Sequence, residues 1–188
     1  MEVPPRRRKG RLLVASPSLT DPSFRRSVVL VLEHSDDGAL GVILNRPTDI
    51  LTREALPDRL SDPLPDDAVV HEGGPCEPQS VLLLGEFAEE AGSIGGTPVV
   101  GALRVVEPDA DLRPIGGAVV GLRAFGGYAG WGGGQLEDEI DEDAWIDAEC
   151  DPGDVFCDDP GSLWADVLER KGGNYRLVAR MPLDPSMN

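Results

Sequence analysis

Short apolar runs, separated by glycine, proline and aspartate, dominate the first half of the chain. Residues 27–33 form a continuous apolar run rich in valine, which predicts a strand buried on both faces. Residues 10–15 and 39–45 are also largely apolar and predict two more strands. The turn signal Asp36-Asp37-Gly38 separates the apolar run at residues 27–33 from the one at residues 39–45, so we expect a hairpin there.

The remaining elements alternate between strands and short helices. Strands are predicted at residues 80–84, 99–106, 118–125 and 145–146, helices at residues 109–113 and 162–171, and a closing core segment at residues 175–181. Strands joined by short turns pair antiparallel, and the helices fall between groups of strands. We therefore predict an α+β fold, a mixed, largely antiparallel sheet with helices packed against it.

The domain organisation follows from the same pattern. Residues 11–181 are expected to form a single compact domain, with a disordered basic arm at residues 1–10 and a tail at residues 182–188. The apolar stretch after the arm is too short for a secretory signal, and no run approaches the roughly 18 apolar residues of a membrane span. We expect a cytoplasmic protein without membrane contact.

Charge narrows the possible partners. The chain has 34 Asp and Glu against 17 Lys and Arg, a net charge of −17. Such a field repels polyanions, and DNA affinity draws on Lys and Arg that neutralise phosphates, so nucleic acid is an unlikely partner by charge. The local exception is the arm, with basic residues between Arg6 and Arg11.

Residues 127–140 are the most informative stretch, because a glycine-rich, aromatic loop is predicted to lead into an acidic amphipathic helix. Leu136 and Ile140 are four residues apart and would dock one face of that helix. The loop lacks the spacing of a phosphate-binding motif, and the acids that follow would oppose an anion. A structural turn that packs Tyr128 and Trp131 is the simpler interpretation.

The alternative interpretation is a surface for a protein partner. Trp131 and Trp145 would serve as aromatic anchors, with Tyr128, Gln135 and Glu137 beside them. The acidic helix would supply the charged part of that surface.

Several motifs in a fixed order identify a family. They are residues 10–17, residues 21–28, Glu33-His34, residues 38–47, Gly73-Gly74-Pro75, residues 127–140 with Trp145, and residues 184–188. Together they resemble the AlgH/YqgE family of bacterial proteins over nearly everything after the arm. The resemblance implies a compact mixed fold with a glycine-rich surface. It also brings the label of a transcriptional regulator, which is not tied to a settled biochemical activity.

A second candidate surface lies where the third predicted strand ends. Asn45 can bond neighbouring backbone and Pro47 ends the strand, so a structural corner is expected. Alternatively, Arg46 could supply anion contacts in a polar pocket. Gly73, Gly74 and Pro75 would then let the backbone approach a small ligand closely.

Other chemistries have weaker patterns. His71, Cys76, Cys150 and Cys157 lack the paired spacing of structural zinc sites. A calcium loop beginning at Asp147 would have Pro152 where glycine is needed. In a nucleophilic pair of His71 and Cys76, the nearby Glu72 and Glu77 would disfavour a thiolate. We expect no metal, no cofactor and no catalytic residue.

Three functional hypotheses remain. The first is a non-enzymatic protein that acts through protein–protein contacts, for example in regulation. The second is a transcriptional regulator that binds DNA directly through the basic arm, although no helix-turn-helix pattern is visible. The third is an enzyme or small-ligand binder that uses the corner at Asn45 and Arg46 with Gly73-Gly74.

Overall fold

The computed structural model describes residues 7–92 and 96–182. Its strands are β1 (Arg11–Ala15), β2 (Val28–Ser35), β3 (Gly38–Ile43), β4 (Pro47–Leu51), β5 (Val69–Glu72), β6 (Cys76–Phe87), β7 (Gly96–Val100), β8 (Leu103–Val106), β9 (Val119–Gly132) and β10 (Trp145–Glu149). Its helices are α1 (Thr52–Ala55), α2 (Asp58–Ser61), α3 (Gln135–Asp141), α4 (Pro152–Val155), α5 (Leu163–Lys171) and α6 (Tyr175–Ala179), with 3₁₀ turns η1 (Glu89–Ala91) and η2 (Arg113–Ala118).

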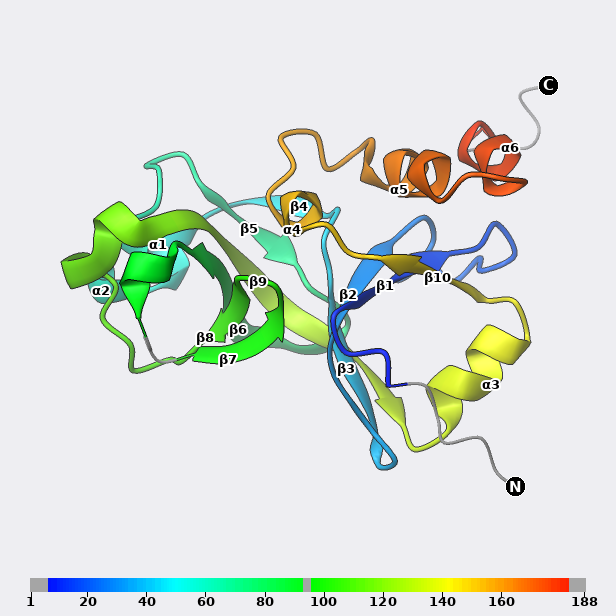
Figure 1. The fold of residues 1–188 in the computed structure, drawn as a ribbon, viewed down its shortest axis with the longest axis horizontal. Coiled ribbons are helices and arrows are strands. Elements are labelled where there is room, and N and C mark those ends of the chain that lie inside the picture. The colour runs from blue at the N-terminus through cyan, green and yellow to red at the C-terminus, as the bar shows by residue number, and fades with distance from the viewer. Residues whose placement is uncertain (1–6, 93–95, 183–188) are drawn as a thin grey trace.

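The strands form one curled sheet, so the predicted α+β class is confirmed (Figure 1). Their order is β10-β1-β2-β3-β9-β6-β8-β7, with β4 and β5 paired beside this path. Among the described strands, the pairing of β5 with β9 is parallel and the others are antiparallel. The predicted hairpin is confirmed as β2 and β3.

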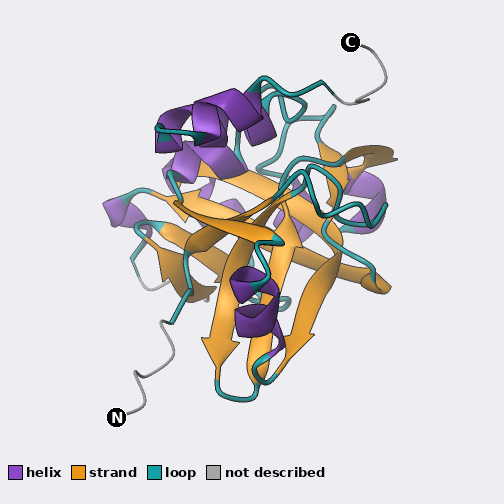
Figure 2. Ribbon diagram, turned by 90° about the vertical axis from the view of Figure 1, so that its right-hand side faces the viewer, coloured by secondary structure: helices purple, strands orange, loops and turns teal. Residues whose placement is uncertain are grey.

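Strands β1, β2 and β3 are buried on both faces, as their apolar runs predict. Successive side chains point to opposite faces of a strand. In β2, Val28 and Leu30 pack with α5 on one face, whereas Val29 and Val31 pack beneath α3 on the other. Helices α5 and α3 accordingly lie on opposite sides of these strands (Figure 1, Figure 2). A third apolar cluster lies beneath α2 and η2 and contains Leu60 and Leu112.

Strand β9 corrects the largest error of the sequence analysis. Residues 127–132 of the predicted loop are instead the end of a strand that runs from Val119 to Gly132, and only Gly133 and Gly134 form a turn. One part of β9 pairs with β6, residues Phe125 and Gly126 pair with β5, and residues 129–132 pair with β3. The single strand therefore joins the two halves of the sheet.

Three smaller predictions are wrong. Residues 99–106 are not one strand, because β7 and β8 form a hairpin with Gly101 in the left-handed region at φ +55°. The helix expected at residues 109–113 begins only at Arg113, as a 3₁₀ turn. Residues 175–181 do not close the core, since α6 buries only Ala179 and leaves Leu177 exposed.

Residues 7–10 of the predicted arm are described, and Arg8 and Gly10 are attached to the sheet. Residues 1–6 lie outside the described residues. The backbone N–H of Arg8 donates to Nδ1 of His34 at 3.0 Å, and that of Gly10 donates to the Val31 carbonyl at 2.8 Å. The guanidinium of Arg8 pairs with Asp147, which Arg11 also contacts at 2.5 Å. No helix among the described residues has the length and apolar character needed to cross a membrane.

Gly73 and Gly74 carry the chain from β5 to β6 directly over β9. A Cβ at Gly73 would lie 2.3 Å from the carbonyl oxygen of Gly127, and one at Gly74 would lie 2.2 Å from the carbonyl carbon of Tyr128. Gly74 also has φ +152°, and Gly127 has φ +72°. Only glycine allows backbones to approach this closely, so the crossing depends on these positions.

Replacement of Gly73 by alanine should be strongly destabilising, because the clash is with backbone and cannot be relieved by a rotamer change. We expect the free energy of unfolding to fall by about 3 kcal/mol or more, measured by urea denaturation. Gly116→Ala is the matched control, since a Cβ there meets no atom within 4 Å. That control should change stability by less than about 1 kcal/mol. Equal effects of the two substitutions would contradict the close crossing.

Candidate functional site

The predicted aromatic anchors are buried beneath α3 rather than presented to a partner. Trp131 is 7% exposed and Trp145 is 3% exposed. Their rings meet edge to face, with centroids 5.9 Å apart, and Phe24 lies against both rings. This correction follows from β9 being a strand, because Trp131 then points into the sheet face that Leu136 and Ile140 of α3 cover. The predicted apolar docking of α3 is confirmed.

One carboxylate from α3 holds the aromatic cluster together. Both indole N–H groups donate to Oε2 of Glu139, at 2.9 Å from Trp131 and 2.8 Å from Trp145. Gln135 donates to the other oxygen of Glu139 at 2.9 Å and accepts from the backbone N–H of Gly132 at 3.0 Å. Glu139 is therefore a structural acceptor, and Gln135 fixes the start of α3.

Loss of the Glu139 carboxylate should destabilise the fold, because it leaves two buried indole donors without an acceptor. We expect Glu139→Ala to lower the free energy of unfolding by about 2–4 kcal/mol, measured by urea denaturation. Glu139→Gln keeps an acceptor oxygen and should cost less than half of that amount. Asp138→Ala, at an exposed neighbour, should stay within about 0.5 kcal/mol of wild type. A Glu139→Ala protein as stable as the Asp138→Ala protein would refute this role.

The other predicted residues of this surface are spread over different environments. Glu137 lies with its Oε1 2.8 Å from Nε2 of His34, whose side chain is 3% exposed. Tyr128 lies on β9, and its hydroxyl donates to Glu77 at 3.4 Å. The outer face of α3 keeps exposed acids at Asp138 and Asp141. The prediction of a protein partner stays a prediction, now confined to this acidic face.

The corner at Asn45 and Arg46 is structural. Asn45 accepts from the backbone N–H of Val28 at 2.9 Å and donates to the carbonyl of Arg26 at 2.9 Å, which ties together the ends of β2 and β3. The guanidinium of Arg46 donates to the carbonyl oxygens of Pro22 and Arg25, at 3.2 and 3.3 Å. The predicted anion contact of Arg46 is thus replaced by backbone contacts, and Gly73, Gly74 and Pro75 belong to the crossing over β9.

A different cavity combines polar residues that the sequence analysis did not bring together. It has a volume of about 540 Å³, within the range of small-ligand sites. Its polar lining residues are Thr52, Asp67, His71, Arg123, Cys157 and Asp158. They come from α1, β5, β9 and the segments before β5 and after α4. We call it the Arg123 cavity.

Arg123 is the cation of this cavity, and its hydrogen bonds are weak. Its two terminal nitrogens each donate to the carbonyl of Cys157 at 3.4 Å, which is long for such bonds. Among the described residues, no carboxylate forms an ion pair with Arg123. Burial lowers the pKa of the guanidinium, but an arginine stays protonated in proteins. A half-buried positive charge is therefore left without a close counter-ion.

His71 lies beside Arg123 as a neutral base. It is 3% exposed, and its Nδ1 lies 3.0 Å from the Leu44 carbonyl. A carbonyl can only accept, so Nδ1 carries the proton and Nε2 keeps its lone pair. Burial first, and then the charge of Arg123, lower the pKa of His71 to about 4, against the opposing effect of the Leu44 hydrogen bond. The ring also packs edge to face on Phe125, with centroids 5.9 Å apart.

Thr52 and Cys157 complete the polar lining. Thr52 is 1% exposed, and its hydroxyl has no hydrogen-bond partner among the described residues. Such a hydroxyl costs about 1–3 kcal/mol, which a ligand or water would recover. Burial raises the pKa of the Cys157 thiol, more than Arg123 lowers it, so the sulfur is a poor nucleophile. Cys76, the predicted partner of His71, lies elsewhere, on β6 opposite Tyr128.

Titration of His71 should make the fold sensitive to acid. The pKa of His71 is near 6.5 in the unfolded chain and about 4 in the folded protein. The stability that depends on neutral His71 is therefore fully present above pH 6.5 and is lost as the pH falls toward 4. We expect wild type to lose about 3 kcal/mol more than His71→Gln over that window. Urea denaturation at several pH values measures both curves, and parallel curves would contradict a buried neutral His71.

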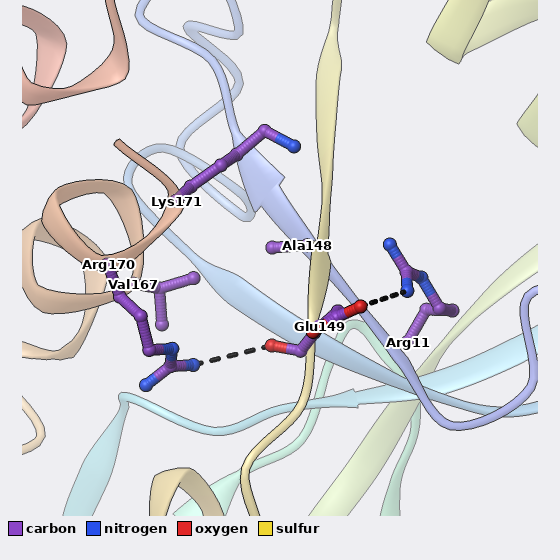
Figure 3. Close-up of a pocket in the computed structure, with 6 residues that line it drawn as sticks. All are labelled: Arg11, Ala148, Glu149, Val167, Arg170 and Lys171. Atoms are coloured by element: carbon purple, nitrogen blue, oxygen red, sulfur yellow. Dashed lines mark hydrogen bonds and ion pairs between the residues drawn. The ribbon is translucent and has the colours of Figure 1, made fainter. Parts of the chain in front are cut away.

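A second cavity, of about 310 Å³, lies at the free edge of β10 (Figure 3). Arg11 and Arg170 approach Glu149 from opposite sides. The positively charged side chains of this cavity already have hydrogen-bond or ion-pair partners. Lys171 donates to the Asp147 carbonyl at 2.7 Å, and Arg170 donates to the Glu149 carbonyl at 3.3 Å. Arg170 also makes a two-fold contact with Asp154, at 2.9 and 2.6 Å. These side chains cover edge carbonyls, which protects the strand from pairing with another chain.

The zinc and calcium alternatives of the sequence analysis find no support in the described residues. Within residues 7–92 and 96–182, no group of three or more His, Cys, Asp or Glu side chains is placed to hold a metal ion. Asp147 is engaged by arginines, and Asp151 caps α4 by accepting from the Gly153 N–H at 3.0 Å.

Comparison with known proteins places the chain among homologous sequences and structures. It matches the AlgH-like family over residues 12–176. It is similar to a UPF0301 protein of Streptomyces coelicolor, with 45% identity over 183 residues that cover 95% of this chain and 94% of the relative.

Two solved structures share the fold. The crystal structure of protein DIP2367 from Corynebacterium diphtheriae has a TM-score of 0.83 and 32% identity, covering 96% of this chain and 95% of that one. The solution structure of the AlgH protein from Pseudomonas aeruginosa, also a UPF0301 protein, has a TM-score of 0.69 and 28% identity, covering 98% of this chain and 99% of that one.

Proposed function

This chain belongs to the AlgH-like family, and from that premise we propose that it binds a small organic molecule which presents a carboxylate to Arg123. The third hypothesis of the sequence analysis, a small-ligand binder, is thus the one that we favour. The site moves from the Asn45 corner to the Arg123 cavity, because the corner residues are occupied by backbone contacts.

The observation that carries this proposal is the state of Arg123. A guanidinium presents several donors in a planar fork that matches the two oxygens of a carboxylate. Here both terminal nitrogens make only a long contact to one carbonyl, 3.4 Å in each case. A ligand carboxylate would replace that weak contact with two charge-assisted hydrogen bonds.

Binding rather than catalysis suits the other lining groups. Burial keeps the thiol of Cys157 protonated and unactivated, and among the hydrogen bonds of the described residues none joins it to His71. Neutral His71 can accept a hydrogen bond, and the hydroxyl of Thr52 can donate or accept one. These properties support recognition of a ligand.

The two remaining hypotheses keep separate sites. A protein partner would use the acidic outer face of α3, around Asp138 and Asp141. Direct DNA binding would use the arm, of which Arg6 lies outside the described residues, whereas Arg8 and Arg11 are paired with Asp147. The net charge of −17 gives no general support to DNA binding.

The test is a thermal-shift screen of small carboxylates against wild type, Arg123→Gln and Arg180→Gln. A true ligand at about ten times its Kd stabilises the fold by about 1.4 kcal/mol, which raises the Tm of wild type by roughly 3–6 °C. The shift should disappear in Arg123→Gln and persist in Arg180→Gln, whose side chain is 74% exposed on another part of the chain. Arg123→Lys keeps the charge but not the fork, and should retain only part of the shift.

Two outcomes count against the proposal. In the first, no carboxylate stabilises wild type. In the second, the stabilising compounds raise the Tm of Arg123→Gln by the same amount. Comparison of the free proteins by amide NMR spectra establishes that each variant keeps the fold.

A further inference from the structure

The charges that line the Arg123 cavity do not suit a simple anion. Among its described lining residues, Arg123 is the only Lys or Arg, whereas two exposed acids, Asp67 and Asp158, also line it. Asp158 is close enough for its charge to act on the guanidinium, yet the two groups form no ion pair. With His71 neutral, the lining carries one positive and two negative charges. A ligand with only a negative charge would therefore be attracted by Arg123 and repelled by both acids.

The hydrogen-bonding groups show the same asymmetry. Nε2 of His71 has a free lone pair, because Nδ1 carries the proton that faces Leu44. Asp67 and Asp158 can only accept while ionised. The hydroxyl of Thr52 can donate or accept, and the thiol of Cys157 is a weak donor. The other polar side chains that line the cavity beside Arg123 are acceptors. The ligand must accordingly bring hydrogen-bond donors and positive charge as well as a carboxylate.

The remaining walls are apolar. Leu64, Val69 and Leu122 line the cavity together with three prolines. The volume of about 540 Å³ exceeds what the two charged groups of a small ligand need. An apolar side chain between the charged groups and these walls would be buried favourably, at roughly 25 cal/mol per Å².

We propose that the ligand of the Arg123 cavity is a free α-amino acid with an apolar side chain. Its carboxylate contacts Arg123, and its ammonium group faces His71, Asp67 and Asp158. This inference rests on the proposed function, because it names the class of the ligand that Arg123 binds. It excludes phosphates and polyanions, which the two aspartates oppose.

Matched probes separate the contribution of each charge. L-leucine has both charged groups, 4-methylpentanoate has the same skeleton without the ammonium, and 3-methylbutylamine has it without the carboxylate. The twenty standard amino acids are also tested singly, in case another apolar side chain fits better. Binding to the full-length protein is measured by isothermal titration calorimetry and by amide chemical-shift changes.

We expect at least one apolar amino acid to bind at least tenfold more tightly than its deaminated acid and its decarboxylated amine. Asp158→Asn should weaken that amino acid several-fold, while leaving the affinity of the deaminated acid unchanged or raised. Asp109→Asn is the matched control, because Asp109 is also exposed but does not line the cavity. It should change neither affinity.

The outcomes distinguish the two proposals. If the deaminated acids bind as tightly as the amino acids and depend on Arg123, the zwitterion is wrong and the carboxylate site stands. If the amines bind as tightly as the amino acids, or if neither acids nor amino acids bind, both proposals fail. Equal amino-acid affinities of Asp158→Asn and Asp109→Asn would overturn the role proposed for Asp158.

Discussion

The fold depends on the pairing of β9 with three different strands, and this pairing depends on close backbone packing at its centre. Gly126 of β9 is opposite Glu72 of β5 and Val81 of β6. The chain can pass from β5 to β6 over Gly127 only because Gly73 and Gly74 have no side chain. The same crossing sets β5 beside β9, and so places His71 of β5 near Arg123 of β9. The cavity is therefore a product of the glycine contacts.

Much of the sheet could be predicted because its buried strands are visible in the sequence as runs of apolar residues. The strands β1, β2 and β3 consist largely of residues that are buried on both faces, and the hairpin turn between β2 and β3 has a specific local chemistry. Residues 127–132 were wrongly predicted to be a loop for the opposite reason. Glycine contributes no side chain to a periodic pattern, so a strand selected for close backbone approach has the composition of a loop. The same error led to the wrong prediction that Trp131 and Trp145 are presented to a partner.

The Arg123 cavity could not be inferred from residue order. Thr52, His71, Arg123 and Cys157 belong to four separate segments, and none of them lies in a motif with a characteristic spacing. Local reasoning instead emphasised Asn45, Arg46 and Gly73, which are distinctive in sequence because the fold requires them. A neutral histidine and an arginine without a counter-ion become visible only when burial and hydrogen-bond partners are known.

The continuity of β9 also limits how the molecule can move. Phe125 and Gly126 pair with β5 on one side of the strand and with β6 on the other. Bending β9 at this point would break ladder bonds on both sides, which disfavours a hinge there. A ligand of the proposed site would then not enter by rotation of one half of the sheet away from the other. Its route must be made by the short segments at residues 64–68 and 157–160, which border the cavity outside the strands. The rate of exchange would then be set by small loop displacements, while the sheet itself stays rigid.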